Sequence, residues 1–280
     1  MSLGNQVAAM SAQVAIVRQA MELGLWFHTS QEYGGSGGTF QVLRRAFDEC
    51  PGRRPPIIAK IRCDDAEVLR FDVEDLLRRL DVERVDIVQL CKSKHDRREI
   101  VDDLLEDGPR AAACHDLAKR GLARSFCLEL FITCSADGTR AIRNSLFDAY
   151  IFYWNPIERE IAAETYAALK QSPARVLALR TVCGGLNTPT DLARFSVDKP
   201  HYRTDRFETV WPLVVESGCQ DVLELSARYL ASQPQVLTTI GGTSSAEHMV
   251  RYFEAVRDAR PLAPEWVAKL DALHDQWAGA

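Results

Sequence analysis

A tyrosine in a glycine-rich loop is the first residue whose position points to chemistry. Tyr33 lies in the stretch 24–38, where the apolar run 25–27 follows Gly24 and several further glycines follow the tyrosine. An apolar run directly after a helix-ending glycine is typical of a short buried strand. In a barrel of alternating strands and helices, the loops that follow the strands form the mouth where chemistry is done. Because glycines let the backbone turn sharply, we expect Tyr33 to stand at such a mouth.

A lysine inside an apolar run is the second residue of this kind. Pro55 and Pro56 break the chain, and the run 57–61 that follows reads as a strand with Lys60 inside it. Tyr33 and Lys60 therefore follow or occupy two successive predicted strands.

Strands and helices alternate along the rest of the chain and must position these side chains. The predicted strands are 25–28, 57–61, 85–90, 123–130, 149–154, 176–179 and 236–240. The predicted helices are 10–23, 39–49, 73–80, 102–120 with an interruption near Gly108-Pro109, 135–146, 158–171, 217–232, 245–258 and 264–277. Residues 187–212 show no clear period, and we expect a long loop over the mouth. Only about ten residues precede the first helix, so we expect Gln6–Ala9 to form a minimal additional strand with no hairpin before it.

This order predicts the fold class. Strand–helix alternation with short links implies a parallel sheet, and eight repeats without a Gly-x-Gly-x-x-Gly turn favour a closed barrel over a doubly wound sheet. The sequence therefore predicts a (β/α)8 TIM barrel with an extra C-terminal helix, formed as a single domain by residues 1–280.

Composition excludes several classes of protein. The chain is 46% hydrophobic and 26% charged, as in ordinary globular proteins, and its net charge of −5 argues against a nucleic-acid or anionic-membrane surface. No apolar run approaches 18 residues, and the N-terminus lacks the features of a signal peptide. The eight cysteines form no CxxC pair or metal-ligand spacing. We therefore expect reduced thiols, no metal site and a cytoplasmic location.

Six motifs in a fixed order resemble those of the aldo-keto reductases, from about residue 11 to 258. They are Phe27…Tyr33-Gly34, Ile58-Ala59-Lys60, Arg79-Leu80 with Val85-Asp86-Ile87-Val88-Gln89, Gly121-Leu122-Ala123-Arg124, Asn155-Pro156 with Glu158-Arg159, and Gly241-Gly242-Thr243. The resemblance implies a TIM barrel that binds NADPH across the mouth and reduces the carbonyl group of a small aldehyde or ketone.

The resemblance also implies four catalytic groups, of which two are present. A Tyr hydroxyl donates a proton to the carbonyl oxygen, and a Lys lowers the pKa of that phenol from about 10. Tyr33 and Lys60 align with these residues. The Asp that keeps the Lys charged is replaced by His28, and the His that orients the substrate is replaced by Cys91.

The missing Asp has consequences for Lys60. Without a carboxylate partner a buried lysine is costly to keep charged, so we expect its pKa to fall. Two residues could compensate: Glu129, if it points into the mouth, or Cys91, as a thiolate and potential nucleophile. The simpler interpretations are a solvated rim carboxylate for Glu129, a space-filling thiol for Cys91 and a hydrogen-bonded core residue for His28. His95 is expected to be exposed.

Further departures affect the nicotinamide end of the implied cofactor site. The usual Ser-Asn pair aligns with Glu129-Leu130, the Gln of the sixth strand with Ile151, and the stacking aromatic with Leu179 or Arg180. At the phosphate end, the amides of Gly242, Thr243, Ser244 and Ser245 precede a predicted helix and could hold a phosphate, with His248 one turn on and Tyr252 where an Asn is common.

We therefore expect weak NADP binding with little preference over NAD, and possible loss of the cofactor altogether. A carbonyl reductase remains the favoured function. The alternative is a redox-inactive protein of the same fold that serves binding, regulation or non-redox chemistry.

Overall fold

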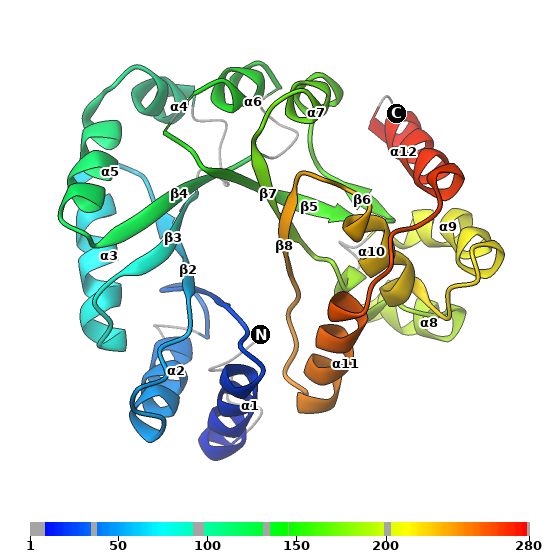
Figure 1. Cartoon of the computed structure of the whole chain (residues 1–280), viewed down its shortest axis with the longest axis horizontal. Helices are drawn as coiled ribbons and strands as arrows, with labels where there is room; N and C mark the ends of the chain where they lie inside the picture. The colour runs from blue at the N-terminus through cyan, green and yellow to red at the C-terminus, as the bar shows by residue number, and fades with distance from the viewer. Residues whose placement is uncertain are drawn as a thin grey trace. The chain divides into compact units, whose positions relative to one another are not determined.

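The computed structural model describes residues 9–34, 38–91, 98–130, 135–144, 146–198 and 203–278 (Figure 1). The chain divides into two compact units. The first comprises residues 1–129, 136–150 and 243–249, and the second comprises residues 130–135, 151–242 and 250–280.

The first unit alternates strands and helices from its first described residues. Its elements are α1 (Met10–Glu22), β1 (Phe27–Ser30), α2 (Gly38–Glu49), β2 (Ile57–Arg62), α3 (Ala66–Leu80), β3 (Val85–Cys91), α4 (Arg98–Leu105), α5 (Pro109–Lys119), β4 (Ala123–Glu129) and α6 (Ser135–Ile142). The predicted interruption near Gly108-Pro109 is confirmed, because Pro109 begins α5.

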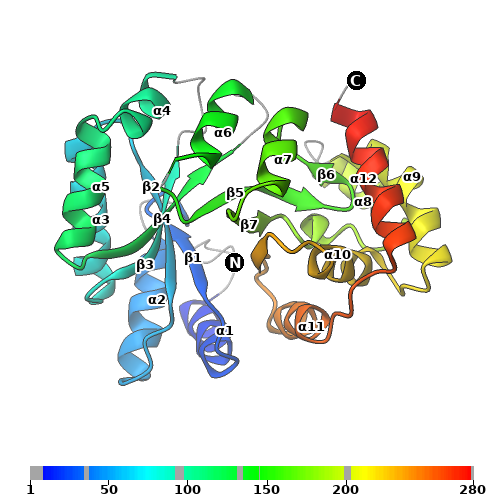
Figure 2. The same ribbon diagram turned by 45° about the horizontal axis from the view of Figure 1, so that its top comes forward.

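Strands β1 to β4 are parallel, and their register places several polar side chains on one face of the sheet. Ser30 pairs with Lys60, Lys60 with Gln89, and Gln89 with Cys127. Residues paired in this way point to the same face of a sheet, and their sequence neighbours point to the other face. The other face carries apolar residues, including Ile57, Ala59, Ile61, Val88, Leu90, Phe126 and Leu128. Helices α2, α3 and α5 lie against β1, β2 and β4, and both views show α3 and α5 side by side (Figures 1 and 2).

Helix α3 shows how local sequence signals set the element boundaries. The Asp65 side chain caps its N-terminus by accepting a hydrogen bond from the Val68 amide at 2.8 Å. The helix ends at Asp81, whose φ of 54° is left-handed. Between these ends, the apolar residues Leu69, Val73, Leu76 and Leu80 recur on one face and are all buried.

The second unit contains the remaining elements. They are β5 (Ala149–Asn155), which begins in the first unit, β6 (Glu158–Arg159), α7 (Ala163–Lys170), β7 (Arg175–Leu179), the short 3-10 helix η1 (Cys183–Gly185), α8 (Pro189–Asp198), α9 (Thr204–Glu216), α10 (Val222–Ala231), β8 (Val236–Ile240), α11 (Ala246–Arg257) and α12 (Pro264–Ala278). Strands β7 and β8 are parallel, and α11 begins in the first unit.

The predicted helix 158–171 is wrong in its first part. Glu158–Arg159 instead forms β6, which pairs antiparallel with β5 through Trp154 and Arg159. The cause is the Asn155 side chain, whose Oδ1 accepts hydrogen bonds from the amides of Ile157 (2.9 Å) and Glu158 (3.0 Å) and so reverses the chain. The helix begins only at Ala163.

The predicted long loop 187–212 is also wrong, because it holds α8 and most of α9. Pro212 suggested a break, yet it lies inside α9. Phe207, Val210 and Val214 bury one face of this helix, and this burial outweighs the local cost of the proline. The helix predicted from 217 therefore begins later, at Val222.

The other predicted elements are confirmed to within a few residues, apart from α3, which begins at Ala66, and α6, which ends at Ile142. Of the predicted strand Gln6–Ala9, only Ala9 is among the described residues, and it immediately precedes α1. The charged segment around His95 also lies outside them. A single domain over residues 1–280 stays a prediction. Among the described residues, no helix is long and apolar enough to cross a membrane.

Candidate functional site

The carboxyl ends of β1 to β4 carry the polar side chains that could do chemistry. His28, Lys60, Gln89, Cys91 and Glu129 are contributed by these four strands. The register places them on the face opposite the helix-packed one. The sequence-predicted residues of this group are therefore brought together within the first unit.

Three of these side chains form a hydrogen-bonded series, here called the amide relay: His28, Gln89 and Glu129. Gln89 Nε2 donates to Glu129 Oε1 at 2.5 Å, and Gln89 Oε1 lies 2.6 Å from His28 Nε2. Gln89 is 1% exposed and Glu129 is 2% exposed. The interpretation of Glu129 as a solvated rim carboxylate is wrong, because β4 carries it into the buried polar face.

Burial and surrounding charge determine the ionisation of His28. Burial lowers its pKa from 6.5 to about 4, the hydrogen bond to Gln89 Oε1 opposes this change, and Lys60 adds to it. His28 is therefore neutral at pH 7. The expectation that His28 is a hydrogen-bonded residue agrees with its contact to Gln89.

Lys60 keeps its charge, contrary to the expected fall of its pKa. Burial lowers the pKa, but Cys91, Glu129, Tyr33 and Glu32 together raise it above its ordinary value. Glu32 Oε2 lies 3.9 Å from Lys60 Nζ, with 45% of its side chain exposed against 18% for the lysine. A carboxylate thus lies near Lys60 although His28 occupies the position of the usual Asp.

A tight turn after β1 holds Tyr33 near this group. Its amide donates to the Ser30 carbonyl at 3.2 Å, and Gly34 follows with a φ of 72°. The Tyr33 ring meets the His28 ring edge-on, with centroids 5.8 Å apart. Tyr33 is also close enough to influence the pKa of Lys60. The turn thus places a phenol, a cation and a neutral imidazole together.

Cys91 ends β3 beside a second cysteine. Cys63 Sγ lies 3.1 Å from the Cys91 carbonyl oxygen, to which it donates. Burial raises the pKa of Cys63 to about 12, so it is a thiol at pH 7. The cysteines among the described residues are all unbridged, and no group of three or more His, Cys, Asp or Glu in that part of the chain could hold a metal.

The segment before α11 carries the residues predicted to bind a cofactor phosphate. Ser245 Oγ accepts from the His248 amide at 3.3 Å and so caps the helix, whereas the Ser245 amide donates to Thr243 Oγ1 at 3.0 Å. Gly242, Ser244 and His248 are exposed. The Ser245 amide is thus already engaged, and the exposed residues face solvent near the helix N-terminus.

Arg251, a basic residue of α11, is held by a carboxylate. Its guanidinium pairs with Asp221, the side chain that caps α10. Tyr252, also on α11, packs against Gly241, where an added Cβ would lie 2.8 Å from the ring. The Tyr252 hydroxyl forms a hydrogen bond with Thr181 Oγ1 (2.7 Å) and donates another to Thr239 Oγ1 (2.6 Å). Both side chains are therefore held within the second unit.

A buried polar group follows β5 and β7 in the second unit. The Asn155 amide donates to Glu158 and to the Arg180 carbonyl, both at 3.1 Å, and Arg180 pairs with Glu158 at 3.0 Å. The Arg180 guanidinium lies over the Tyr153 ring, with its Cζ 3.7 Å from the centroid. Burial raises the pKa of Glu158, and Arg180 and Asn155 oppose this.

Sequence analysis missed Gln89 and Glu32. Gln89 could have been found as the polar residue that shares the register position and face of Lys60 in an apolar strand. Glu32 directly precedes Tyr33, but nothing in the sequence indicates that the turn directs it toward Lys60.

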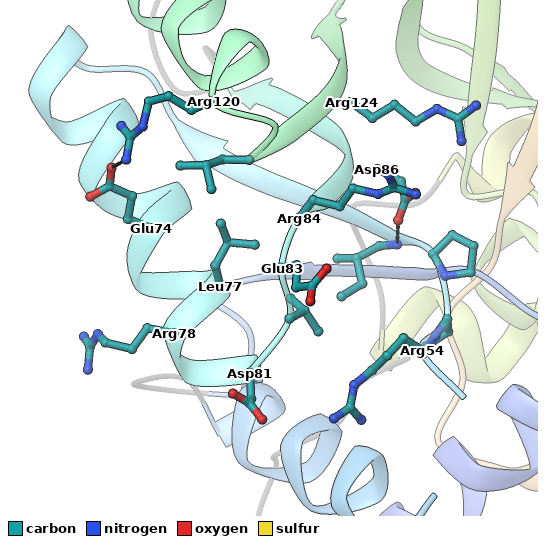
Figure 3. A pocket seen from close by; sticks show the side chains of 15 residues that line it. Arg54, Glu74, Leu77, Arg78, Asp81, Glu83, Arg84, Asp86, Arg120 and Arg124 are labelled. Carbon is teal, nitrogen blue, oxygen red and sulfur yellow. Dashed lines mark hydrogen bonds and ion pairs between the residues drawn. The ribbon is translucent and has the colours of Figure 1, made fainter. Parts of the chain in front are cut away.

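A pocket of about 1120 Å³ lies at the opposite, amino ends of β2 to β4 (Figure 3). Five arginines and four acidic residues line it, together with apolar residues. The charged residues are Arg54, Arg78, Arg84, Arg120, Arg124, Glu74, Asp81, Glu83 and Asp86. The charges nearly balance, and none of the predicted site residues is among them. The pocket is therefore separate from the candidate site.

Parallel strands, each followed by helices, with polar side chains at the strand ends, are the organisation of a (β/α)8 barrel. The chain belongs to the aldo/keto reductase family, whose model matches residues 1–275. No curated protein matches the sequence.

Solved structures confirm the fold. An aldo-keto reductase from Klebsiella pneumoniae, in complex with NADPH, is 20% identical with a TM-score of 0.71, over 97% of this chain and 88% of that one. An aldo-keto reductase from Bacillus halodurans is 20% identical with a TM-score of 0.71, over 97% and 91%. A glycerol dehydrogenase from Gluconobacter oxydans is 20% identical with a TM-score of 0.68, over 94% and 85%.

Proposed function

We propose that the protein reduces the carbonyl group of a small molecule with NAD(P)H. Tyr33 acts as the general acid and Lys60 assists it. The observation that carries this proposal is that Lys60 lies beside Tyr33 and within 3.9 Å of Glu32, and that its neighbours raise its pKa although His28 stands in place of the usual Asp. A positive charge next to a phenol stabilises the phenolate that remains after proton donation.

The division of tasks follows from the contacts of each side chain. Tyr33 supplies the proton, and Lys60 stabilises the negative charge that is left on its oxygen. Glu129 and Glu32 keep Lys60 protonated. Neutral His28, held by Gln89, contacts the Tyr33 ring and so limits its orientation.

The phosphate end of a nicotinamide cofactor fits the residues present only in part. NAD(P)H, when bound, supplies the hydride. Gly242, Ser244 and His248 are exposed at the N-terminus of α11, where backbone amides and the helix dipole favour a phosphate. Because Arg251 is paired with Asp221, His248 is the nearby group that could contact a 2′-phosphate. We therefore expect weak binding with little preference for NADPH over NADH.

Titration with NADPH and NADH, followed by a screen of small aldehydes, tests the proposal. Tyr33→Phe should lower kcat/KM by about 10²- to 10⁴-fold, because it removes the proton donor. Glu129→Gln should lower it about as far, because it weakens the charge that keeps Lys60 protonated. Glu83→Gln, an exposed acid on the pocket at the opposite strand ends, is the matched control and should leave activity unchanged.

A redox-inactive protein of the same fold is the second candidate. Arg180 favours it: the family resemblance places a stacking aromatic at Leu179 or Arg180, and here the guanidinium is paired with Glu158 and stacked on Tyr153. If neither nicotinamide binds, and if His28→Asp combined with Cys91→His restores no reduction, the reductase proposal fails. Cys91 would then be the first residue to examine, by thiol titration.

A further inference from the structure

Gln89 occupies the middle of the amide relay, and the resemblance to the family assigns it no task. Its side chain is almost completely buried on β3. The two ends of the amide contact different titratable groups. Nε2 lies 2.5 Å from Glu129 Oε1, and Oε1 lies 2.6 Å from His28 Nε2. A buried amide with both ends engaged is held in one orientation, because turning it would break two hydrogen bonds.

The chemistry of the three groups determines where the protons lie. An ionised carboxylate only accepts hydrogen bonds, so the amide nitrogen of Gln89 must face Glu129. The amide oxygen then faces His28, and since this oxygen also only accepts, His28 Nε2 must carry the proton. In a neutral imidazole the other nitrogen, Nδ1, is then an acceptor.

Lys60 selects this arrangement over its reverse. A protonated Glu129 could instead donate to the Gln89 oxygen, and the amide nitrogen would then donate to His28. The positive charge of Lys60, which shares the register position of Gln89, favours the carboxylate form of Glu129.

We infer that Gln89 is a positioning residue that holds the proton of neutral His28 on Nε2 and the Glu129 carboxylate on the face of Lys60. Gln89 acts through these two neighbours, to which its side chain is hydrogen-bonded. This role rests on the proposed function. It explains how His28, which stands in place of the Asp, and the Glu129 carboxylate act together on Lys60 and Tyr33.

The position of the His28 proton can be measured directly by long-range ¹⁵N–¹H correlation on the labelled, full-length protein. We expect the wild type to show the Nε2–H form at pH 7. Gln89→Leu should give a mixture of the two neutral forms, because it removes the acceptor. A wild type with the proton on Nδ1 would overturn the inference.

Gln89→Glu provides a second variant of nearly identical shape, in case the leucine variant does not fold. It places a carboxylate against His28, so His28 should titrate at a clearly higher pH than in the wild type. An unchanged titration would show that residue 89 is not in contact with His28, and that result would overturn the inference. Glu32→Gln is the control: it removes a carboxylate near Lys60 that lies outside the amide relay, and it should leave the His28 proton in place.

Steady-state kinetics provide a test that is independent of the ¹⁵N–¹H spectrum. Gln89→Leu should lower kcat by about 10²-fold with KM unchanged, as expected when catalytic groups are displaced but substrate contacts are kept. A change confined to KM would contradict a positioning role. A wild type that reduces no carbonyl compound would overturn the proposed function, and the spectrum would still decide the proton arrangement.

Discussion

The two ends of strands β2 to β4 carry charged groups in opposite environments. At the carboxyl ends, Gln89 and Glu129 are almost fully buried and hydrogen-bonded in series. At the amino ends, Arg84 and Arg124 are exposed and line the pocket drawn in Figure 3. The same strands therefore supply one cluster protected from water and one that water surrounds.

This difference determines how strongly the groups act on one another. Water screens exposed charges, so an ion pair at the surface contributes little to stability. Charges removed from water interact strongly, and each becomes costly once its partner is lost. Charge interactions are therefore strong at the carboxyl ends, where the proposed chemistry takes place, and weak at the amino ends.

The largest expected effect is the loss of the Lys60 charge. Lys60→Met leaves Glu129 buried without its cation, so the free energy of unfolding should fall by roughly 3 kcal/mol. Urea denaturation at pH 7 measures this change. Arg124→Met, the control at the other end of the same sheet, should change it by less than about 0.5 kcal/mol. Equal effects of the two substitutions would show that the two strand ends do not differ.

The pH dependence of stability should report the burial of His28. Its pKa is about 4 in the folded protein and 6.5 in the unfolded chain, so between these values the unfolded chain binds more protons. Stability should therefore fall as the pH falls from about 6.5 to 4. The free energy of unfolding should therefore differ between pH 7 and pH 4.5, and His28→Gln should reduce that difference by about 2 kcal/mol. This is less than 1.36 kcal/mol for each pKa unit of the shift, because His28 is partly exposed.

Urea unfolding of both proteins at the two pH values provides the measurement. Only the pH-dependent part is compared, so a uniform destabilisation by the substitution does not affect the result. His274 is also buried with a lowered pKa, but it is present in both proteins and cancels. An unchanged pH dependence in the variant would mean that His28 is solvated in the folded state.

Local patterns were sufficient for most of the fold. Strand 236–240 and the break before Pro109 were predicted correctly, because apolar runs and proline act through neighbouring residues. The errors arose where a longer-range effect prevailed. The Asn155 side chain reversed the chain before a helical pattern, and burial of Phe207 and Val214 kept α9 helical through a proline.

The sequence placed several of the candidate residues at neighbouring strand ends but did not reveal Gln89, Glu32 or the contacts between the side chains. Tyr33, Lys60 and Cys91 were found through motif order, and parallel strands bring their ends together. The burial of Glu129 and its contact with Gln89 depend on side-chain directions that no single stretch of sequence encodes. The rise in the pKa of Lys60 followed from those directions, which is why the expected fall was wrong.

A smaller effect is expected from Asp86 at the amino ends. Asp86 Oδ2 accepts from the Ile57 amide at 2.9 Å and so joins the beginnings of β2 and β3. Asp86→Ala should lower the free energy of unfolding by about 1 to 1.5 kcal/mol, because it leaves that amide without its acceptor. Glu83→Ala removes an exposed acid from the same pocket and should have almost no effect in the same urea experiment. A loss of 3 kcal/mol or more from Asp86→Ala would contradict the solvated character of this end.

The smallest effect should come from an ion pair on the pocket wall. Arg120 and Glu74 lie 2.6 Å apart, but both side chains are 45% exposed. A double-mutant cycle with Arg120→Met and Glu74→Gln should give a coupling energy below about 1 kcal/mol. Because the charges are in contact with water, 1 M NaCl should abolish most of this coupling. The equivalent cycle for Lys60 and Glu129 should give a larger coupling that largely survives salt, since Glu129 is 2% exposed and the Lys60 side chain 18%. If the two cycles respond equally to salt, the carboxyl-end cluster is hydrated, and its advantage for activating Tyr33 disappears.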